Sequence, residues 1–221
     1  HFHRLSGYSL SNRYNSWHLD KVLEYPNNKY SEDAMLMGAE MAYTAKDYEK
    51  ALHIYKQLKD KAASMERRQL AKTGMLRSAH MLGNEEEIIF TATDLLADTK
   101  LAPELSNEAH YYRAKAYLDA GKTDGAMEDL KILAKDTRNV YGAEAKYKVA
   151  QIYFDGGQTD KAEQEVLNYI EVSTPHTYWL ARSFVLLADV YMKSGRNLDA
   201  KQYLLSLKQN YQADDDIAGM I

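Results

Sequence analysis

The chain has 221 residues, a formal net charge of -4 and no cysteine. The lack of cysteine excludes disulfides, cysteine nucleophiles and thiolate metal sites. The negative net charge provides no overall attraction to nucleic acid or to anionic lipid. The length suits one or two ordinary domains or one repeat array, and no apolar run approaches the roughly 18 residues of a membrane span.

The first 30 residues fit a regular pattern least well. Residues 12–25 place Trp17 on a plausible helix face, and a turn signal follows at Pro26. We interpret residues 1–30 as a partial N-terminal repeat. The chain opens at His1 without an initiator methionine or a leader, so we expect a fragment or a processed form.

A pair of anchor residues recurs from residue 31 onward. The two members of each pair are twelve positions apart, and the first members of successive pairs are separated by 37, 38, 36 and 38 residues. Constant spacing within a pair and variable spacing between pairs predict rigid helical hairpins joined by links that absorb the variation. The pairs are Ala39 and Ala51, Leu76 and Ile88, Ala114 and Ala126, Ala150 and Ala162, and Ala188 and Ala200.

Each hairpin is expected to turn at one residue that ends its first helix. In four hairpins this residue is a glycine, which adopts the left-handed conformation without strain, whereas the first hairpin has Lys46. We expect Asn84 with Glu87 to form a capping box in the second hairpin. In the fourth, Thr159 or Asp160 is the expected cap. The four glycines are Gly83, Gly121, Gly157 and Gly195.

The predicted fold is therefore all-α, with one repeat array over residues 31–210. Residues 211–221, which include three consecutive aspartates, form either the polar end of the array or the start of one more helix. No proline falls inside a predicted helix. The five hairpins span about residues 32–60, 66–98, 106–136, 142–172 and 176–210.

This pattern resembles the tetratricopeptide repeat (TPR). Hairpins of that family carry a small residue, an aromatic residue three or four positions later, a glycine turn, an alanine and then an apolar residue. The second hairpin departs most, because Leu76 and Ile88 replace its small residues. The resemblance covers about residues 31–210 and implies a right-handed α-α superhelix of about five hairpins plus the partial repeat. The third hairpin shows the pattern as Ala114, Tyr117, Gly121, Ala126 and Leu130.

A narrower likeness concerns the links between hairpins. The segments at residues 25–34 and 174–191, the long repeat period and the ending at residues 210–217 look like those of large cell-envelope TPR proteins of Gram-negative bacteria. This resemblance implies the C-terminal part of a longer repeat protein, located in the periplasm or associated with the cell envelope. A cytoplasmic location is the alternative.

The family resemblance also implies a binding surface. TPR arrays usually bind a protein or peptide partner on the concave face, which the first helices line. The implied surface is aromatic with mixed charges, and it suits an extended peptide or a helix. Its residues are Leu36, Glu40, Tyr43, Thr73, Arg77, His80, Tyr111, Lys115, Leu118, Tyr147, Gln151, Phe154, Val185, Asp189 and Met192.

Two interpretations of the groove tyrosines remain open. Tyr111 and Tyr147 either contact the partner or pack between adjacent hairpins with only their hydroxyls reaching water. The family's clamp for peptide carboxylates uses asparagines and basic residues, but Glu40 and Gln151 occupy the asparagine positions here. A co-chaperone that binds carboxylate tails is therefore not expected.

Sites for chemistry are not evident in the sequence. The histidines are scattered without metal-ligand spacing, and the aspartates at residues 214–216 lack the glycine and closing glutamate of a calcium loop. No phosphate loop, serine elbow or nucleophile with a neighbouring base appears. We therefore expect no enzyme activity, no metal, no cofactor, no nucleic-acid partner and no membrane span.

Two functions are compatible with these observations. The first is a non-enzymatic interaction scaffold that binds a protein or peptide in its concave groove. The alternative is an accessory or assembly subunit of a cell-envelope complex, which docks through its convex face or its open N-terminal end. Self-association through that end is a further possibility, because a truncated repeat exposes apolar surface.

Overall fold

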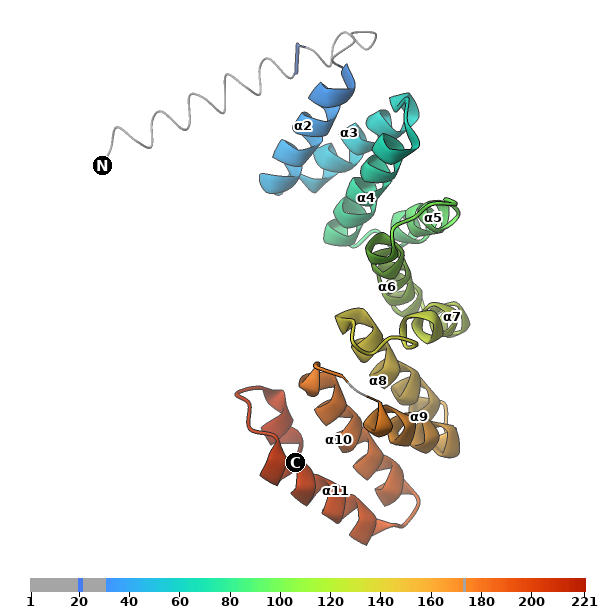
Figure 1. Cartoon of the computed structure of the whole chain (residues 1–221), viewed down its shortest axis with the longest axis vertical. Helices are drawn as coiled ribbons and strands as arrows, with labels where there is room; N and C mark the ends of the chain where they lie inside the picture. Colours follow the sequence, from blue (N-terminus) through green and yellow to red (C-terminus); the bar gives the residue numbers. More distant parts are fainter. Residues whose placement is uncertain (1–19, 22–30, 173) are drawn as a thin grey trace, which may run out of the picture. The chain divides into compact units, whose positions relative to one another are not determined.

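The computed structural model describes residues 20–21, 31–172 and 174–221, and the described part is built from α-helices with one short 3₁₀ helix (Figure 1). By its contacts, the chain divides into two compact units, and the boundary between them in the sequence falls between Tyr112 and Arg113. Ten α-helices lie within residues 31–210, and no strand occurs among the described residues. The predicted all-α helical-repeat fold class is therefore confirmed.

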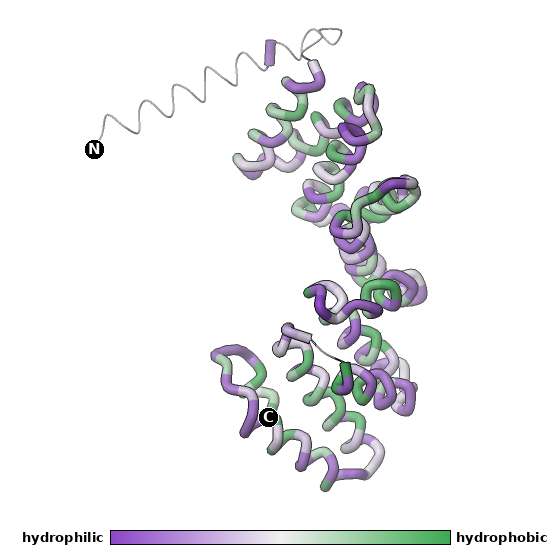
Figure 2. Tube along the Cα trace, viewed as in Figure 1, coloured by the Kyte–Doolittle hydropathy of each residue, from purple (hydrophilic) through white to green (hydrophobic). Residues whose placement is uncertain are grey.

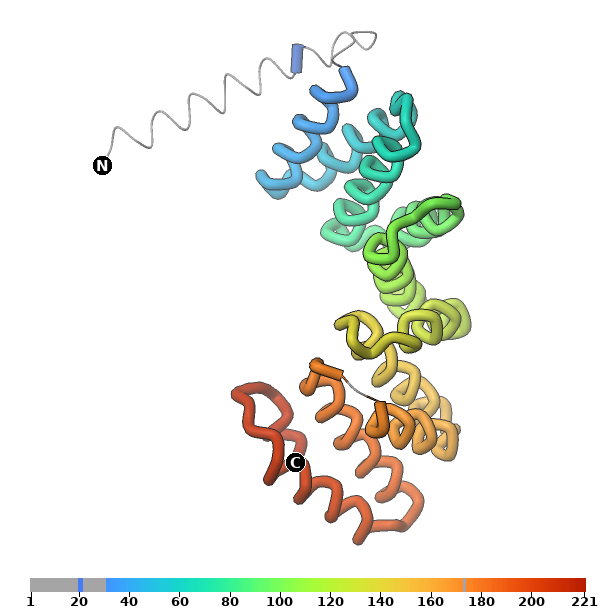
Figure 3. The backbone as a smooth tube through the Cα atoms, in the orientation of Figure 1, coloured from blue at the N-terminus to red at the C-terminus, as the bar shows by residue number. Residues whose placement is uncertain are grey.

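The helices follow one another as antiparallel pairs joined by short turns (Figure 3). Helix α6 contains the boundary between the two units. The bounds are α2 Ser31–Thr44, α3 Tyr48–Lys61, α4 Met65–Leu82, α5 Glu85–Leu96, α6 Pro103–Asp119, α7 Thr123–Leu133, α8 Val140–Asp155, α9 Thr159–Glu171, α10 Thr177–Lys193 and α11 Asn197–Asn210.

All five hairpin turns share one backbone geometry. One residue in each turn is left-handed, and the residue after it donates its amide hydrogen to the carbonyl five positions earlier. Asp47 donates to Ala42 at 2.9 Å, and Arg196 donates to Tyr191 at 2.8 Å. These bonds satisfy carbonyl groups that the helix end leaves free. The predicted turn positions are thus confirmed. The left-handed residues have φ of 66° at Gly83, 73° at Gly121, 77° at Gly157, 76° at Gly195 and 63° at Lys46.

Side-chain caps differ between the second helices. The Asn84 side chain accepts a hydrogen bond from the Glu87 amide at 3.2 Å, as expected. The Glu87 carboxylate, however, pairs with Lys56 at 3.1 Å, so only the Asn84 half of the capping box is observed. Helix α9 was expected to be capped by Thr159 or Asp160, which is wrong: its N-cap is Gln158, without a side-chain cap bond.

Each unit buries its core between the paired helices. All ten predicted anchor residues are at most 4% exposed, as expected for positions where paired helices cross. One buried apolar cluster of the first unit comes from α2, α3 and α4, and one of the second unit comes from α8, α9, α10 and α11. Figure 2 shows the resulting alternation of apolar and polar residues along each helix.

The C-terminal segment is more than a polar end. Residues Asp216–Met220 form a 3₁₀ helix, η1, and Ile217 within it is 1% exposed. Ile217 packs with Ala181 of α10 and Leu207 of α11. The segment therefore covers apolar surface of the last hairpin with one buried anchor.

Some expectations concern residues outside the described part. The partial repeat proposed for residues 1–30 lies there, apart from Asp20 and Lys21, which are helical and exposed. Among the described residues, no helix is both long and apolar enough to cross a membrane. The same residues contain no group of three or more potential metal ligands.

Candidate partner-binding groove

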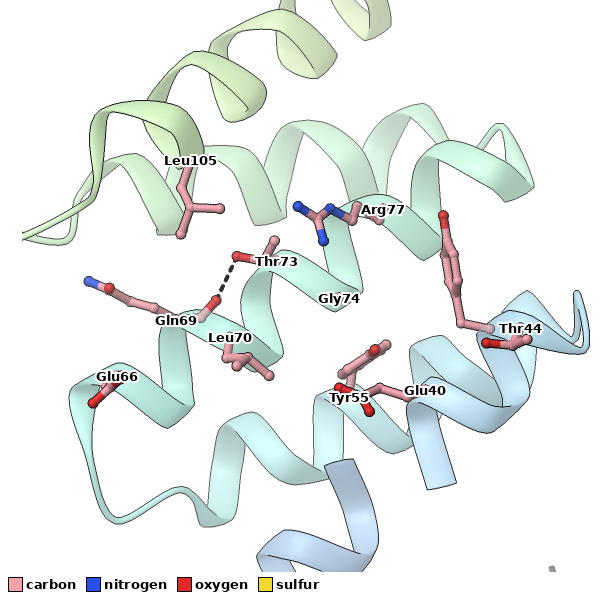
Figure 4. Close-up of a pocket in the computed structure, with 11 residues that line it drawn as sticks. Glu40, Thr44, Tyr55, Glu66, Gln69, Leu70, Thr73, Gly74, Arg77 and Leu105 are labelled. Carbon is pink, nitrogen blue, oxygen red and sulfur yellow. Dashed lines mark hydrogen bonds between the residues drawn. The ribbon is translucent and has the colours of Figure 1, made fainter. Parts of the chain in front are cut away.

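A groove of about 660 Å³ lies in the first unit beside helices α2, α3, α4 and α6 (Figure 4). It is lined by four of the residues predicted for the binding surface, Glu40, Tyr43, Thr73 and Arg77. The first two come from α2 and the last two from α4. The register of the repeats therefore brings predicted residues of two successive hairpins together in one groove.

Tyr55 of α3 and Gly74 of α4 form the floor of this groove. A Cβ atom on Gly74 would lie 2.3 Å from the Tyr55 ring, so only glycine lets the ring lie against α4. Tyr55 is 7% exposed, and burial is the main cause that raises the pKa of its hydroxyl. The floor is consequently a fixed aromatic surface.

Apolar and charged side chains surround the floor. Leu70 is 42% exposed, and Leu105 of α6 lines the opposite side (Figure 4). Glu40 and Glu66 are exposed carboxylates in the lining. Within the part of the chain that the structure describes, neither has a cationic side chain within salt-bridge distance. The groove therefore combines apolar contact area with acidic side chains.

Arg77 differs from these carboxylates because it already has a partner. Its guanidinium donates to Glu108 through Nε at 2.6 Å and through a terminal nitrogen at 2.9 Å. These hydrogen bonds are the first cause that raises the Arg77 pKa. Glu108 is 9% exposed, so this pair connects α4 to α6 and does not offer a free cation.

The predicted residues of the first unit other than Glu40, Tyr43 and Arg77 have mixed surroundings. Thr73 is buried, and its hydroxyl donates to the Gln69 carbonyl at 2.8 Å. The His80 ring stacks on Tyr112 at 4.3 Å between centroids. Leu36 packs against the core, and Tyr111 is partly exposed.

In the second unit the corresponding surface is occupied by the protein's own side chains. Tyr147 is 5% exposed, and its hydroxyl donates to Gln151 at 2.8 Å and accepts from Arg182 at 3.0 Å. The Arg182 guanidinium lies 5.1 Å from the Tyr147 ring centroid, and the Trp179 ring lies 5.6 Å from it. Tyr147 therefore packs between α8 and α10, as the packing alternative describes.

The remaining predicted residues of this unit are dispersed. Lys115, Leu118 and Asp189 are partly exposed, and burial raises the pKa of the Asp189 carboxyl. Phe154 packs on the core beneath the Lys193 ammonium, which is 5.1 Å from the ring centroid. Val185 packs beside the η1 cluster, whereas Met192 is 48% exposed.

Sequence reasoning did not identify seven residues of the groove lining: Thr44, Tyr55, Glu66, Gln69, Leu70, Gly74 and Leu105. Tyr55 belongs to a second helix, whereas the prediction considered only first helices. One signal was available, because Gly74 lies in the middle of a predicted helix. Such a glycine indicates a close approach by another group.

Comparison with known proteins identifies the repeat. A sequence model described as a tetratricopeptide repeat matches residues 108–136, which include the end of α6 and all of α7. No curated protein matches the chain in sequence.

Solved structures share the fold. The crystal structure of MamA protein superposes with a TM-score of 0.63 at 17% identity, covering 82% of this chain and 92% of MamA. A putative kinesin light chain of Podosopora anserina with nearly identical TPR-like repeats gives 0.58 at 18% identity, over 83% and 96% of the two chains. BtubC from P. vanneervenii gives 0.59 at 12% identity, over 92% of each chain.

At these identities the structures establish the fold, and the sequence match at residues 108–136 supplies the family signature. Anchor burial, turn geometry and the two comparisons agree with one another. The chain therefore contains a tetratricopeptide-repeat match at residues 108–136 within a helical-repeat fold like that of the solved TPR structures.

Proposed function

We propose that this chain is a non-enzymatic scaffold that binds a protein or peptide segment in the groove of its first unit. The observation that carries the proposal is the convergence of Glu40, Tyr43, Thr73 and Arg77, predicted from the repeat register, on one groove of about 660 Å³. TPR families are generally interaction modules rather than catalysts, which supports a binding function.

The lining defines the chemistry of the partner. The Tyr55 floor with Leu70 and Leu105 suits an apolar side chain, which gains affinity by leaving water. The carboxylates of Glu40 and Glu66 favour a lysine or arginine beside that apolar residue. We therefore propose a segment that presents an apolar anchor next to a basic residue.

Site-specific photocrosslinking tests this assignment. A benzoylphenylalanine at position 70 is expected to capture the partner through its bound segment, and mass spectrometry then identifies the crosslinked peptide. The same group at Leu205, which is 46% exposed in the second unit, serves as the matched control. Capture at both positions with equal yield would remove the groove from consideration.

A charge reversal tests the proposed partner chemistry. Glu40→Lys with Glu66→Lys is expected to weaken binding of the identified segment by about tenfold or more. Glu128→Lys with Glu171→Lys makes the same change in net charge at exposed positions outside the groove. If both double variants weaken binding equally, binding depends on the net charge of the protein and not on the two groove carboxylates. Arg77 is unsuitable for this test because its loss would leave Glu108 buried without that partner.

A second candidate function is an accessory subunit of a cell-envelope complex that docks through second helices. The specific observation in its favour is the exposure of apolar residues there, with Phe90 of α5 at 63% and Leu198 of α11 at 80%. Phe90→Lys or Leu198→Lys should then abolish assembly while leaving the groove segment bound. Docking or self-association through residues 1–30 concerns mainly residues outside the described part.

The envelope location is a proposal supported by the links between hairpins. Fractionation of cells that make the natural full-length protein would test it, with periplasmic and cytoplasmic markers measured in parallel. Recovery with the cytoplasmic marker would contradict the envelope assignment.

A further inference from the structure

A second groove, of about 560 Å³, lies in the second unit and has a different chemistry from the first. It is bounded by the end of α7, the link to α8, and the facing sides of α8 and α9. Its lining includes four cationic side chains, Lys131, Lys135, Arg138 and Lys146, but only two carboxylates, Asp136 and Glu165. Although the whole chain is negatively charged, this groove is cationic.

The carboxylates already have partners within the groove. Asp136 accepts hydrogen bonds from Arg138 at 3.0 and 3.3 Å, and these bonds are the first cause that lowers the Asp136 pKa. Glu165 lies 3.1 Å from the Lys146 ammonium. Lys131 and Lys135 have no carboxylate within salt-bridge distance among the described residues. Two ammonium groups are therefore available to an incoming anion.

An aromatic ring places a further cation beside this groove. The Lys131 ammonium lies 5.7 Å from the ring centroid of Tyr153, and the Lys161 ammonium lies 5.5 Å from the same centroid. Lys161, like Lys131, has no carboxylate partner in the described part of the chain. Tyr153 lines the groove and is partly exposed, so its ring can contact a bound chain beside these cations.

The link that forms one edge of the groove is fixed by the next link. The Thr174 hydroxyl donates to the Thr137 carbonyl at 2.7 Å, and the His176 Nε2 atom lies 2.9 Å from the Arg138 carbonyl oxygen. Since a carbonyl only accepts, this His176 nitrogen carries the hydrogen. Gly142 adds a further constraint, because a Cβ there would lie 1.9 Å from the Asp136 oxygen. The edge is thus held in place before any ligand arrives.

From these observations we infer that the second groove binds an acidic peptide segment, distinct from the partner of the first groove. Lys131 and Lys135 are four residues apart in sequence and both line the groove, and the Lys161 ammonium lies 5.5 Å from the Tyr153 ring centroid. Carboxylates spaced along an extended segment can pair with such a row of cations. A single small anion would use only part of it.

Fluorescence anisotropy with a fluorescein-labelled hexaglutamate peptide tests the inference on the whole chain. Saturable binding that weakens with added salt is expected. Lys131→Gln with Lys135→Gln should lower the affinity by about fivefold or more. Lys131→Arg with Lys135→Arg should retain most of it.

The matched control is Lys201→Gln with Lys208→Gln, which removes two lysines of the second unit outside this groove. It should change the affinity by less than about twofold. Equal losses in both double variants, or no saturable binding, would overturn the inference. So would displacement of the peptide by inorganic phosphate at the peptide's own concentration, which would assign the groove to phosphate groups.

A second measurement does not depend on the variants. Amide resonances of Tyr153 and of residues 134–139 are expected to shift on titration with the peptide, while those around Leu70 stay unchanged. Shifts confined to the first unit would contradict the inference. Because the two grooves lie in different units, failure here leaves the function proposed for the first groove intact.

Discussion

The two units use the same repeat register but treat their first-helix surface differently. Thr73 of the first unit and Tyr147 of the second both lie three residues before the first anchor of their hairpins. The short Thr73 side chain bonds to its own helix, and a groove remains beside it. Tyr147 instead fills the corresponding place and contacts Arg182 of the next first helix. A short side chain at this position accompanies an open groove in the first unit, and a large one accompanies a packed surface in the second.

The C-terminal segment extends this difference. Asp216 accepts a hydrogen bond from the Tyr178 hydroxyl at 3.2 Å and lies 3.6 Å from the Arg182 guanidinium. The second unit therefore covers Arg182 with its own carboxylate as well as with Tyr147. In the first unit, Arg77 pairs with Glu108, yet a groove remains beside it.

The largest expected effect comes from opening the packed surface. Tyr147→Ala should lower the free energy of unfolding by about 3–5 kcal/mol, because it leaves a cavity in the core of the second unit. Urea unfolding followed by fluorescence of Trp179, whose ring centroid is 5.6 Å from that of Tyr147, measures this loss. Trp17→Phe should be the common background, so that one tryptophan reports.

The control for this experiment is Tyr147→Phe, which keeps the ring and removes the hydroxyl between Gln151 and Arg182. It should cost only about 1 kcal/mol. If Tyr147→Ala were as stable as the wild type, Tyr147 would be a surface residue, and the contrast between the two units would not hold.

The next effect concerns the open groove. Gly74→Ala places a methyl group where the Tyr55 ring lies, since the added atom would be 2.3 Å from it. The ring must move, at a cost of about 1–3 kcal/mol of unfolding free energy, and the groove floor changes with it. Gly219→Ala, where no atom lies within 4 Å of the added carbon, is the control for both stability and binding. Equal melting temperatures for the two variants would contradict the role given to Gly74.

These contrasts indicate how far the sequence alone could lead. The anchor pairs and the turn glycines follow from local rules, because close helix crossings need small residues and left-handed turns favour glycine. They therefore predicted the buried anchors and all five turns. Glu40 and Arg77 came from the family's register, and the structure brings both to one groove.

The remaining features depend on contacts between distant residues. Whether Tyr147 is exposed depends on Arg182, 35 positions later, and no local pattern specifies that contact. The same holds for η1, because the burial of Ile217 depends on Ala181 and Leu207. The sequence did not predict the cationic groove, because its lysines resemble ordinary exposed residues. Only the fold shows that Lys131 and Lys135 have no carboxylate within salt-bridge distance among the described residues.

Alkaline pH should affect the second unit more than the first. Burial, with nearby charge from Tyr203 and Glu163, raises the pKa of Tyr191 to about 12, whereas the ordinary value is 10.0. The folded state therefore holds the proton more tightly than the unfolded state, and this contribution is complete below pH 10. It is lost as the pH rises from about 10 to about 12, by on the order of 2 kcal/mol.

Urea unfolding at about pH 8, about pH 10 and about pH 11.5 measures this dependence. Tyr191→Phe provides the comparison, because it keeps the ring, which lies 4.1 Å from the Arg196 guanidinium, but cannot ionise. The variant should lose less stability than the wild type over this range. Parallel pH profiles would show that Tyr191 ionises equally easily in both states.

The smallest expected effect concerns the turn that lacks glycine. Lys46 is left-handed, with φ of 63°, and it is exposed. A side chain in this conformation costs roughly 1 kcal/mol, so Lys46→Gly should stabilise the first unit by about 0.5–1 kcal/mol after the greater freedom of glycine in the unfolded chain is subtracted. The reverse change at the equivalent turn, Gly195→Ala, should destabilise the second unit by a similar amount. No atom lies within 4 Å of the added carbon there, so any loss reports the backbone conformation alone. Urea midpoints that move in the same direction for both variants would show that the two turns do not share one conformational preference in solution.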